Sequence, residues 1–218
     1  MHPRSSVLPR ALLVAILFAM IAAVSWPLRG PIYRGVAPAV AESSALSAVF
    51  STLASYGLLI LVATAGILAL VNLLRNRAAF WRLVCGGVGV VVAYAASEGI
   101  KLLVTEQRPC RVWTVDTALA CPAAGDWSWP SNHSVLAAAF ATACLLAVRR
   151  VGWFTVPVAL MIGISRLAVG VHYLHDGASG LALGTAVVAV SVVVLRPVVD
   201  RLPRRWVDAP SPESALVR

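Results

Sequence analysis

The residues best suited to chemistry lie in one stretch between two long apolar runs, from Ser165 to Asp176. Within it, four side chains are of the ionisable type: Arg166, His172, His175 and Asp176. Such side chains are costly at membrane depth, so they usually face a bundle interior or a water-filled cavity and carry function. Because His172 and Asp176 are four residues apart, we predict that they share one face of a helix within hydrogen-bond reach.

This pairing indicates a specific kind of histidine chemistry. A carboxylate that holds one imidazole nitrogen fixes the tautomer and makes the other nitrogen a better nucleophile or base. Arg166 adds a planar guanidinium, which suits a phosphate or a carboxylate. The stretch therefore predicts that His172 acts on an anionic group. We expect His175 to play a supporting role only, because it is adjacent to Asp176 and adjacent side chains point apart on a helix.

A second segment contributes two cations, Lys101 at the end of an apolar run and Arg108 in the following loop. Two cations that converge on one pocket require an anion. The alternative is a lysine that reaches for the membrane interface and an arginine in a solvated loop. Glu98 precedes Lys101 by one helical turn, and we interpret it as the partner of Lys101 in a structural ion pair.

A third segment, Pro130-Ser131-Asn132-His133, opens the next apolar run. Ser or Asn is a natural N-cap, and a helix N-terminus presents unpaired amides and partial positive charge to an anion. His133, in that first turn, is placed to donate a proton to a bound group. A plain capping turn with an interfacial histidine is the alternative.

The composition places these segments in a membrane protein. Of the 218 residues, 60% are hydrophobic and only 12% are charged, whereas soluble domains carry roughly 25% charged residues. The formal net charge is +9, but the arginines gather at the ends of apolar runs, where they set topology. Since no basic stripe with interleaved aromatic residues is present, we do not expect nucleic-acid binding.

Apolar runs of about 17–25 residues match the thickness of a bilayer. They predict an all-α, polytopic membrane protein, a six-transmembrane-helix bundle with helices at 11–26, 48–74, 79–104, 132–148, 151–171 and 177–195. Residues 1–195 are expected to form a single membrane domain and residues 196–218 a polar cytoplasmic tail. We interpret the first run as a retained helix, because the cleavage-like Ala39-Val-Ala41 lies too far beyond it for a signal peptide.

The basic loops also predict the orientation in the cell membrane. Arg75, Arg149 and Arg150 belong to the arginine-rich side, which the positive-inside rule places in the cytoplasm together with both termini. The other side is then extracytoplasmic, and it receives the candidate residues Lys101, Arg108, His133, Arg166, His172 and Asp176. Three separate segments are thus expected to meet at one membrane surface.

The cysteines divide by environment. Cys85 and Cys144 lie inside apolar runs and are interpreted as buried small residues. Cys110 and Cys121 lie in the polar loop on the predicted outer side. In an oxidising compartment they are candidates for a disulfide, and two free thiols are the alternative.

Together, the three segments provide what phosphoryl transfer through a phosphohistidine needs. Cations and amides stabilise the charge on the equatorial oxygens, while a nucleophile and a proton donor stand on opposite sides of phosphorus. The only acidic residues assigned to the spans are Glu98 and Asp176, so no carboxylate cluster indicates a metal site. We expect a mechanism without a metal or a cofactor.

The three segments resemble the signature of the type 2 phosphatidic acid phosphatase (PAP2) superfamily. The matching stretches occur in order as Lys101-x6-Arg108-Pro109, Pro130-Ser131-Asn132-His133 and Ser165-Arg166-x5-His172-x3-Asp176. The resemblance implies that His172 is the nucleophile, that Asp176 orients it and that His133 protonates the leaving group. It implies phosphate binding by Lys101, Arg108, Ser131 and Arg166. Asn132 replaces the usual Gly of the second motif; its amide remains available to phosphate, and its side chain could narrow or specialise the pocket.

The expected function is that of a phosphatase acting on a lipid phosphate or diphosphate at the outer leaflet. A polyprenyl diphosphate is the favoured substrate; phosphatidate, diacylglycerol diphosphate and phosphatidylglycerol phosphate are open alternatives. A lipid phosphotransferase would use the same motifs. A non-catalytic lipid-phosphate transporter needs no nucleophile, so the His–Asp pair argues against it. A soluble vanadium haloperoxidase shares the signature, but the six apolar spans argue against that protein class.

Overall fold

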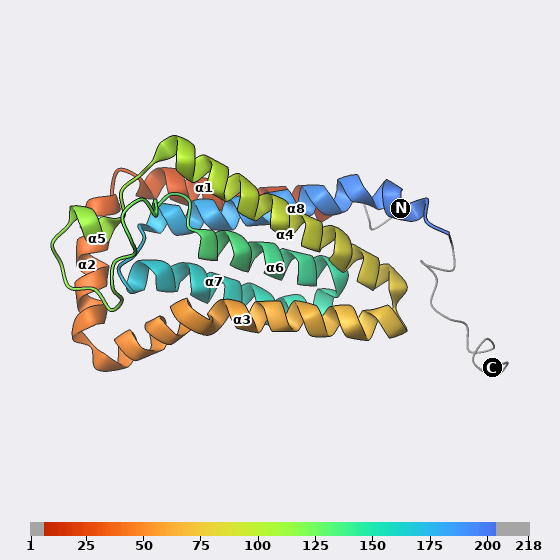
Figure 1. Ribbon diagram of the computed structural model, residues 1–218, viewed down its shortest axis with the longest axis horizontal. Coiled ribbons are helices and arrows are strands. Elements are labelled where there is room, and N and C mark those ends of the chain that lie inside the picture. The colour runs from red at the N-terminus through yellow and green to blue at the C-terminus, as the bar shows by residue number, and fades with distance from the viewer. Residues whose placement is uncertain (1–6, 204–218) are drawn as a thin grey trace.

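Long apolar runs in the sequence become long helices in the computed structural model, which describes residues 7–203 (Figure 1). Every regular element in this part of the chain is helical, so the predicted all-α class is confirmed. The elements in order are α1 (Val7–Ser25), α2 (Arg29–Glu42), α3 (Ser44–Arg75), α4 (Arg77–Val104), α5 (Pro109–Val112), α6 (Asn132–Ala147), the 3-10 helix η1 (Arg149–Val151), α7 (Gly152–Ala168) and α8 (Leu174–Asp200).

Among the described residues, five helices are long and apolar enough to cross a membrane: α1, α3, α4, α7 and α8. The fourth predicted span is present as α6, a shorter apolar helix of 16 residues. The chain runs back and forth along the bundle, and α1 begins at the end where α8 finishes (Figure 1). The crossing of a bilayer by six helices and the cytoplasmic position of the termini remain predictions.

Several predicted boundaries differ from the structure, among them those around α2 and α8. The connection expected between residues 27 and 47 contains α2, whose Pro and Gly content concealed a helix that buries Tyr33 and Ala37 against Leu167 and Tyr173. The last helix was expected over 177–195, but α8 begins at Leu174 and continues to Asp200. The predicted tail therefore starts later, and its remainder from residue 204 lies outside the described residues.

Helix α6 lies at the centre of the bundle, packed against α4, α7 and α8. It is rich in buried alanines, which allow neighbouring backbones to approach closely. At Gly184 of α8 the approach is so close that a β-carbon would overlap the carbonyl oxygen of Val135 in α6. This contact fixes where the N-terminal ends of α6 and α8 lie relative to each other.

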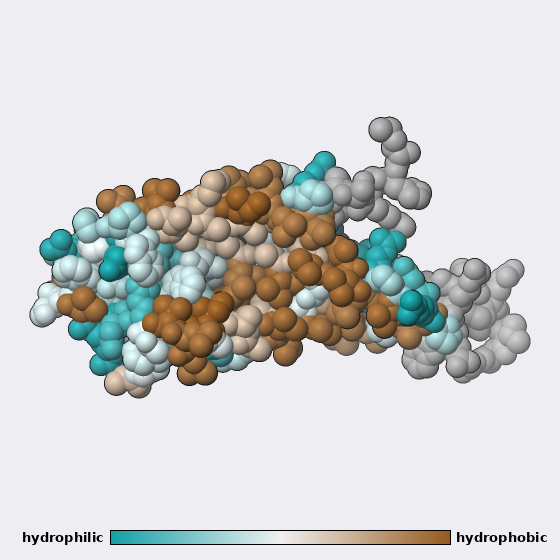
Figure 2. Space-filling view, turned by 90° about the horizontal axis from the view of Figure 1, so that it is seen from above, coloured by the Kyte–Doolittle hydropathy of each residue, from teal (hydrophilic) through white to brown (hydrophobic). Residues whose placement is uncertain are grey.

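The outer surface separates into a hydrophobic belt and hydrophilic ends (Figure 2). Large apolar side chains are exposed along the long helices, among them Leu59 and Leu70 of α3 and Val91 of α4. One hydrophilic end is formed by α2, α5 and the loop between α4 and α6 (Figure 1). A belt of this kind suits a lipid-facing surface, so the fold supports a multi-pass membrane protein.

Candidate active site

The loop between α4 and α6 brings polar groups over the end of the bundle. Cys110 and Cys121 are joined by a disulfide with their Cα atoms 5.8 Å apart, which closes the first part of this loop. Further along, the backbone N–H of Ser128 donates to the carbonyl of Glu106 at 2.9 Å. These contacts turn the loop inward, so that its side chains reach the residues that precede α8.

His172 lies in the short connection between α7 and α8 and is only 1% exposed. Its Nδ1 is 3.2 Å from Oδ2 of Asp176, so the predicted pair forms. The reason given for the pair was wrong, since α8 begins at Leu174 and the two residues do not share a helix. Asp176 instead caps the start of α8 by accepting from the N–H of Tyr173 at 2.8 Å, and the same oxygen accepts from Ser128 Oγ at 2.5 Å.

The surroundings of His172 keep its ring neutral. Burial has the largest effect and lowers the pKa of His172. The hydrogen bond to Asp176 raises this pKa, whereas the charge of Arg108 lowers it, and the resulting pKa is about 3. With Nδ1 directed at Asp176, Nε2 carries the lone pair and lies 2.9 Å from Nη1 of Arg108. A neutral imidazole whose unprotonated nitrogen faces a cation is suited to attack an electrophilic centre once that centre is bound to the cation.

The two cations of the first motif converge on one carboxylate, Asp126. Arg108 donates from Nη2 to Oδ1 of Asp126 at 2.9 Å and from Nε to its backbone carbonyl at 2.8 Å. Lys101 Nζ lies 3.4 Å from the same Oδ1. Burial raises the pKa of Asp126, but the hydrogen bond and charge of Arg108 and the charge of Lys101 outweigh it and lower that pKa. The carboxylate is therefore ionised between two buried cations.

Ser131, Arg166 and His133 complete the cluster. The N–H of Ser131 donates to the carbonyl of Asp176 at 3.1 Å, which joins the start of α6 to the start of α8. Ser131 Oγ and Arg166 Nε are buried and have no hydrogen-bond partner among residues 7–203. His133 lies in the first turn of α6, within electrostatic range of Arg166, Arg108 and Lys101. The three motifs thus meet at one end of the bundle.

The side chain of Asn132 is engaged by residues of α4. Its Nδ2 donates to Oε1 of Glu98 at 2.5 Å, and its Oδ1 accepts from Ser97 Oγ at 2.6 Å. Glu98 also lies 3.9 Å from Lys101, so the predicted ion pair is present but loose. The side chain that departs from the usual motif therefore connects α6 to α4, where it steadies the helix that carries Lys101.

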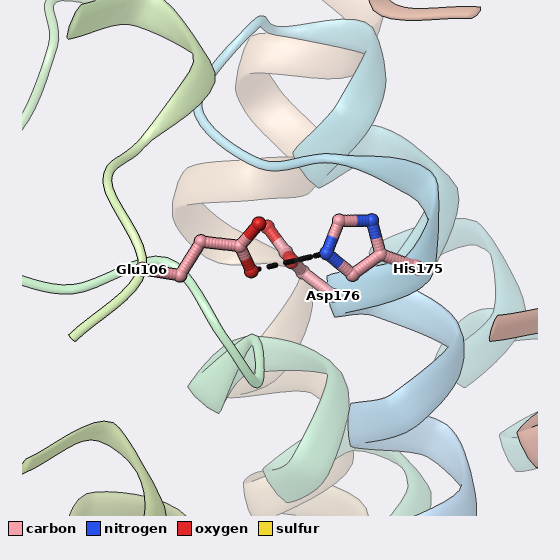
Figure 3. Close-up of side chains that lie close together, drawn as sticks. All are labelled: Glu106, His175 and Asp176. Atoms are coloured by element: carbon pink, nitrogen blue, oxygen red, sulfur yellow. Dashed lines mark hydrogen bonds and ion pairs between the residues drawn. The ribbon is translucent and has the colours of Figure 1, made fainter. Parts of the chain in front are cut away.

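His175 and Asp176 do not point apart as expected (Figure 3). His175 Nε2 lies 3.0 Å from Oδ1 of Asp176 and 3.1 Å from Oε2 of Glu106. The expectation failed because Asp176 folds back to cap α8, which brings its carboxylate beside the preceding imidazole. The ring of His175 packs edge-on against Trp26 with centroids 4.5 Å apart and stacks on Tyr173 at 5.3 Å. His175 is therefore held firmly from several sides.

Glu106, His175 and Asp176 form a carboxylate-containing cluster that was not expected. Their candidate ligand atoms lie within 4.8 Å of one another, a donor set of one nitrogen and two oxygens that would suit a divalent cation. The hydrogen bond between His175 and Glu106 and the close approach of Nε2 to Oδ1 of Asp176 already account for the arrangement. Glu106 was missed because it lies in the loop, although its position two residues before Arg108 is a signal in the sequence.

Comparison with known proteins accords with this geometry. The model of the PAP2 superfamily matches residues 81–199, more than half of the chain. The chain belongs to this superfamily. Its matched region contains all three motifs, from Lys101 to Asp176.

Two proteins with sequences similar to that of this PAP2 chain are named as phosphatases. It is 36% identical over 129 residues to undecaprenyl-diphosphatase BcrC of Bacillus subtilis (strain 168), covering 56% of this chain and 61% of that protein. It is 38% identical over 109 residues to decaprenylphosphoryl-5-phosphoribose phosphatase of Mycobacterium tuberculosis (strain ATCC 25618 / H37Rv), covering 48% of this chain and 56% of that protein. The matches thus span less than two thirds of the length of either relative.

A solved structure shares the fold. It is the transmembrane PAP2-type phosphatidylglycerolphosphate phosphatase from Bacillus subtilis, with a TM-score of 0.60 and 16% sequence identity. The superposition covers 88% of this chain and 98% of that one. The helical arrangement of this PAP2 protein therefore extends well beyond the region that carries the motifs.

Proposed function

We propose that this protein hydrolyses a lipid phosphate or diphosphate through a phosphohistidine on His172. The observation that carries the proposal is the setting of this ring, which is buried and neutral, held at Nδ1 by Asp176 and opposed at Nε2 by Arg108. Nε2 attacks phosphorus, and His133 protonates the departing oxygen. Water activated by His133 then cleaves the phosphorus–nitrogen bond, which releases inorganic phosphate and restores the ring.

Each remaining residue of the cluster has a part in this reaction. Lys101, Arg108 and Arg166 balance the charge that spreads over the phosphoryl oxygens, and the hydroxyl of Ser131 adds a neutral donor. The amides at the start of α6, that of Asn132 included, add the favourable end of a helix dipole. No step of this scheme requires a metal ion.

A polyprenyl diphosphate is the favoured substrate class. The named relatives act on undecaprenyl diphosphate and on decaprenylphosphoryl-5-phosphoribose, and hydrophobic side chains cover much of the visible face of the bundle (Figure 2). The site is proposed to face the extracytoplasmic side of the cell membrane, opposite the arginine-rich loops. The panel of lipids to be tested contains a polyprenyl diphosphate together with phosphatidate, diacylglycerol diphosphate and phosphatidylglycerol phosphate.

The experiment is phosphate release by the purified protein from this panel in the presence of a chelator. We expect turnover of at least one lipid, and loss of at least about 10³-fold in kcat for His172→Ala, because removal of a nucleophile leaves only binding to assist the reaction. Asp116→Asn, an exposed position in the α4–α6 loop, is the matched control and retains activity.

Two readouts test the covalent step directly. Substrate labelled with ³²P at its terminal phosphate should leave an acid-labile, alkali-stable label on wild type and none on His172→Ala. Transfer of the label to an added alcohol, with no free phosphate, would instead identify a phosphotransferase. Unchanged turnover in a folded His172→Ala protein, checked by its melting temperature, would eliminate the mechanism.

A further inference from the structure

The cations that should bind phosphate already hold an anion of the chain itself. Oδ1 of Asp126 accepts from Arg108 at 2.9 Å and lies 3.4 Å from Lys101. Both cations are at least nine-tenths buried, whereas 47% of the Asp126 side chain is exposed. A half-exposed carboxylate therefore reaches inward to a buried pair of cations, where the proposed function places a phosphoryl oxygen.

The same contact affects the nucleophile. Arg108 donates from Nη1 to Nε2 of His172 at 2.9 Å and to the carbonyl of Val171 at 3.0 Å. Asp126 holds the other edge of the guanidinium. In this arrangement the lone pair that must attack phosphorus is engaged by Arg108. A substrate phosphate has to draw the guanidinium toward itself, and it can do so only by taking over the contact made by Asp126.

Asp126 does not occupy the whole site. Ser131 Oγ and Arg166 Nε are buried and have no hydrogen-bond partner among the described residues, and Arg166 lies within electrostatic range of Arg108 and Asp126. Arg166 is anchored through Nη1, which donates to the carbonyl of Ala54 at 3.2 Å. A ligand that displaced Asp126 would therefore gain donors that the carboxylate does not use.

We propose that Asp126 is a specificity-determining residue, an internal anion that only a group with two negative charges displaces readily. This inference rests on the proposed function, since it concerns the same phosphate site. Exchange of one singly charged anion for another gains little Coulomb energy, whereas a doubly charged phosphate interacts about twice as strongly with Lys101, Arg108 and Arg166. Terminal phosphates carry this second charge at neutral pH, and phosphodiesters do not.

The consequence is that the phosphate site discriminates against the phosphodiester lipids that make up most of a membrane. Phosphodiester head groups of ordinary phospholipids outnumber any lipid with a terminal phosphate in a membrane. A bare site of three buried cations would be blocked by them. With Asp126 in place, a diester must give up its hydration and displace a carboxylate of equal charge, so the site stays available to monoesters and diphosphates.

The test uses methyl phosphate and dimethyl phosphate, which have the same phosphorus centre and differ in charge. Binding to the full-length protein in detergent is measured by calorimetry at pH about 8, above the second ionisation of a phosphate monoester near pH 6. Wild type should bind methyl phosphate and show no saturable binding of dimethyl phosphate. Asp126→Asn should bind methyl phosphate about 10-fold more tightly, equivalent to about 1.4 kcal/mol, and should now bind dimethyl phosphate.

Matched variants separate this inference from its alternatives. Asp116→Asn removes a charge from the same loop and should behave as wild type, and Asp126→Glu should preserve the discrimination. If Asp126→Asn does not fold, Asp126→Ser removes the same charge and replaces it in the test. Equal or weaker methyl phosphate binding by the folded variant would overturn the proposal, because Asp126 would then position Arg108 rather than compete with the ligand.

The outcome is independent of the lipid substrate. Failure of wild type to release phosphate from any lipid would remove the proposed function, yet the two probes would still report whether Asp126 excludes singly charged anions. Conversely, normal lipid turnover together with unchanged probe binding in Asp126→Asn would leave the hydrolytic function intact and remove only the role given to Asp126.

Discussion

The carboxylate of Asp176 serves two imidazole rings at once. Oδ2 faces Nδ1 of His172, and Oδ1 faces Nε2 of His175, which in turn contacts Glu106. Two carboxylates this close together repel each other unless a proton or a cation lies between them. Nε2 of His175 lies between the two carboxylates, so the orientation of the proposed nucleophile depends on residues that never touch the substrate.

The neutral state of His172 predicts an effect of pH on stability. Its pKa is about 3 in the folded protein and about 6.5 in an unfolded chain. Between these values only the unfolded state takes up the proton, so the free energy of unfolding falls as pH is lowered from 6.5 toward 3. At pH 5 this residue should cost the fold about 2 kcal/mol relative to neutral pH.

The measurement is unfolding in detergent at neutral pH and at pH 5, for wild type and His172→Asn. The variant lacks the titrating ring, so its stability should decline less over this interval. An equal decline in the two proteins would mean that His172 keeps an ordinary pKa in the fold, and the neutral nucleophile would have to be abandoned.

At the scale of the elements, the helices were predictable and their meeting points were not. Apolar runs located the core of each long helix, since a run of that length has few alternatives to a buried or lipid-facing helix. The spacing of His172 and Asp176 indicated a pair, although the pair arises from capping of α8. Asp126 carried no such signal, because the path of the loop that holds it depends on tertiary contacts and on the disulfide.

The contact between α6 and α8 is the element-level feature with the clearest consequence. A methyl group at Gly184 would overlap the carbonyl oxygen of Val135 and press on the backbone of Ala139. Gly184→Ala should therefore destabilise the protein by about 1–3 kcal/mol and lower activity, because separation of the two helices breaks the hydrogen bond from Ser131 to Asp176.

Gly87→Ala is the matched control, since a β-carbon at this exposed position of α4 has no described heavy atom within 4 Å. Melting temperature and phosphate release are measured for both variants. If Gly184→Ala melts and turns over like Gly87→Ala, the close approach of α6 and α8 does not limit the site.

On the scale of the whole molecule, the candidate residues gather at one end of the bundle and the α3–α4 and α6–α7 turns lie at the other (Figure 1). The distribution of arginines predicts that the second end is cytoplasmic. Exposed positions mark each end: Asp116 in the α4–α6 loop and Arg150 in η1. The remaining cysteines are buried or disulfide-bonded, so they give little background in a labelling experiment.

A membrane-impermeant maleimide should therefore label Asp116→Cys in intact cells and Arg150→Cys only after the membrane is permeabilised. Labelling is read from the mass shift of the purified protein, with wild type as the blank. The opposite pattern would place the site on the cytoplasmic side and remove the basis for an outer-leaflet substrate.

The short length of α6 affects the depth in the bilayer at which the reaction is expected to take place. Sixteen residues rise about 24 Å, less than the roughly 30 Å of a hydrocarbon layer. If α6 crosses the bilayer as predicted, we therefore expect its first turn, which carries His133 and is preceded by Ser131, to lie below the plane of the head groups. A lipid can present its terminal phosphate there without leaving its leaflet, so catalysis should be sensitive to the acyl-chain length of the host bilayer.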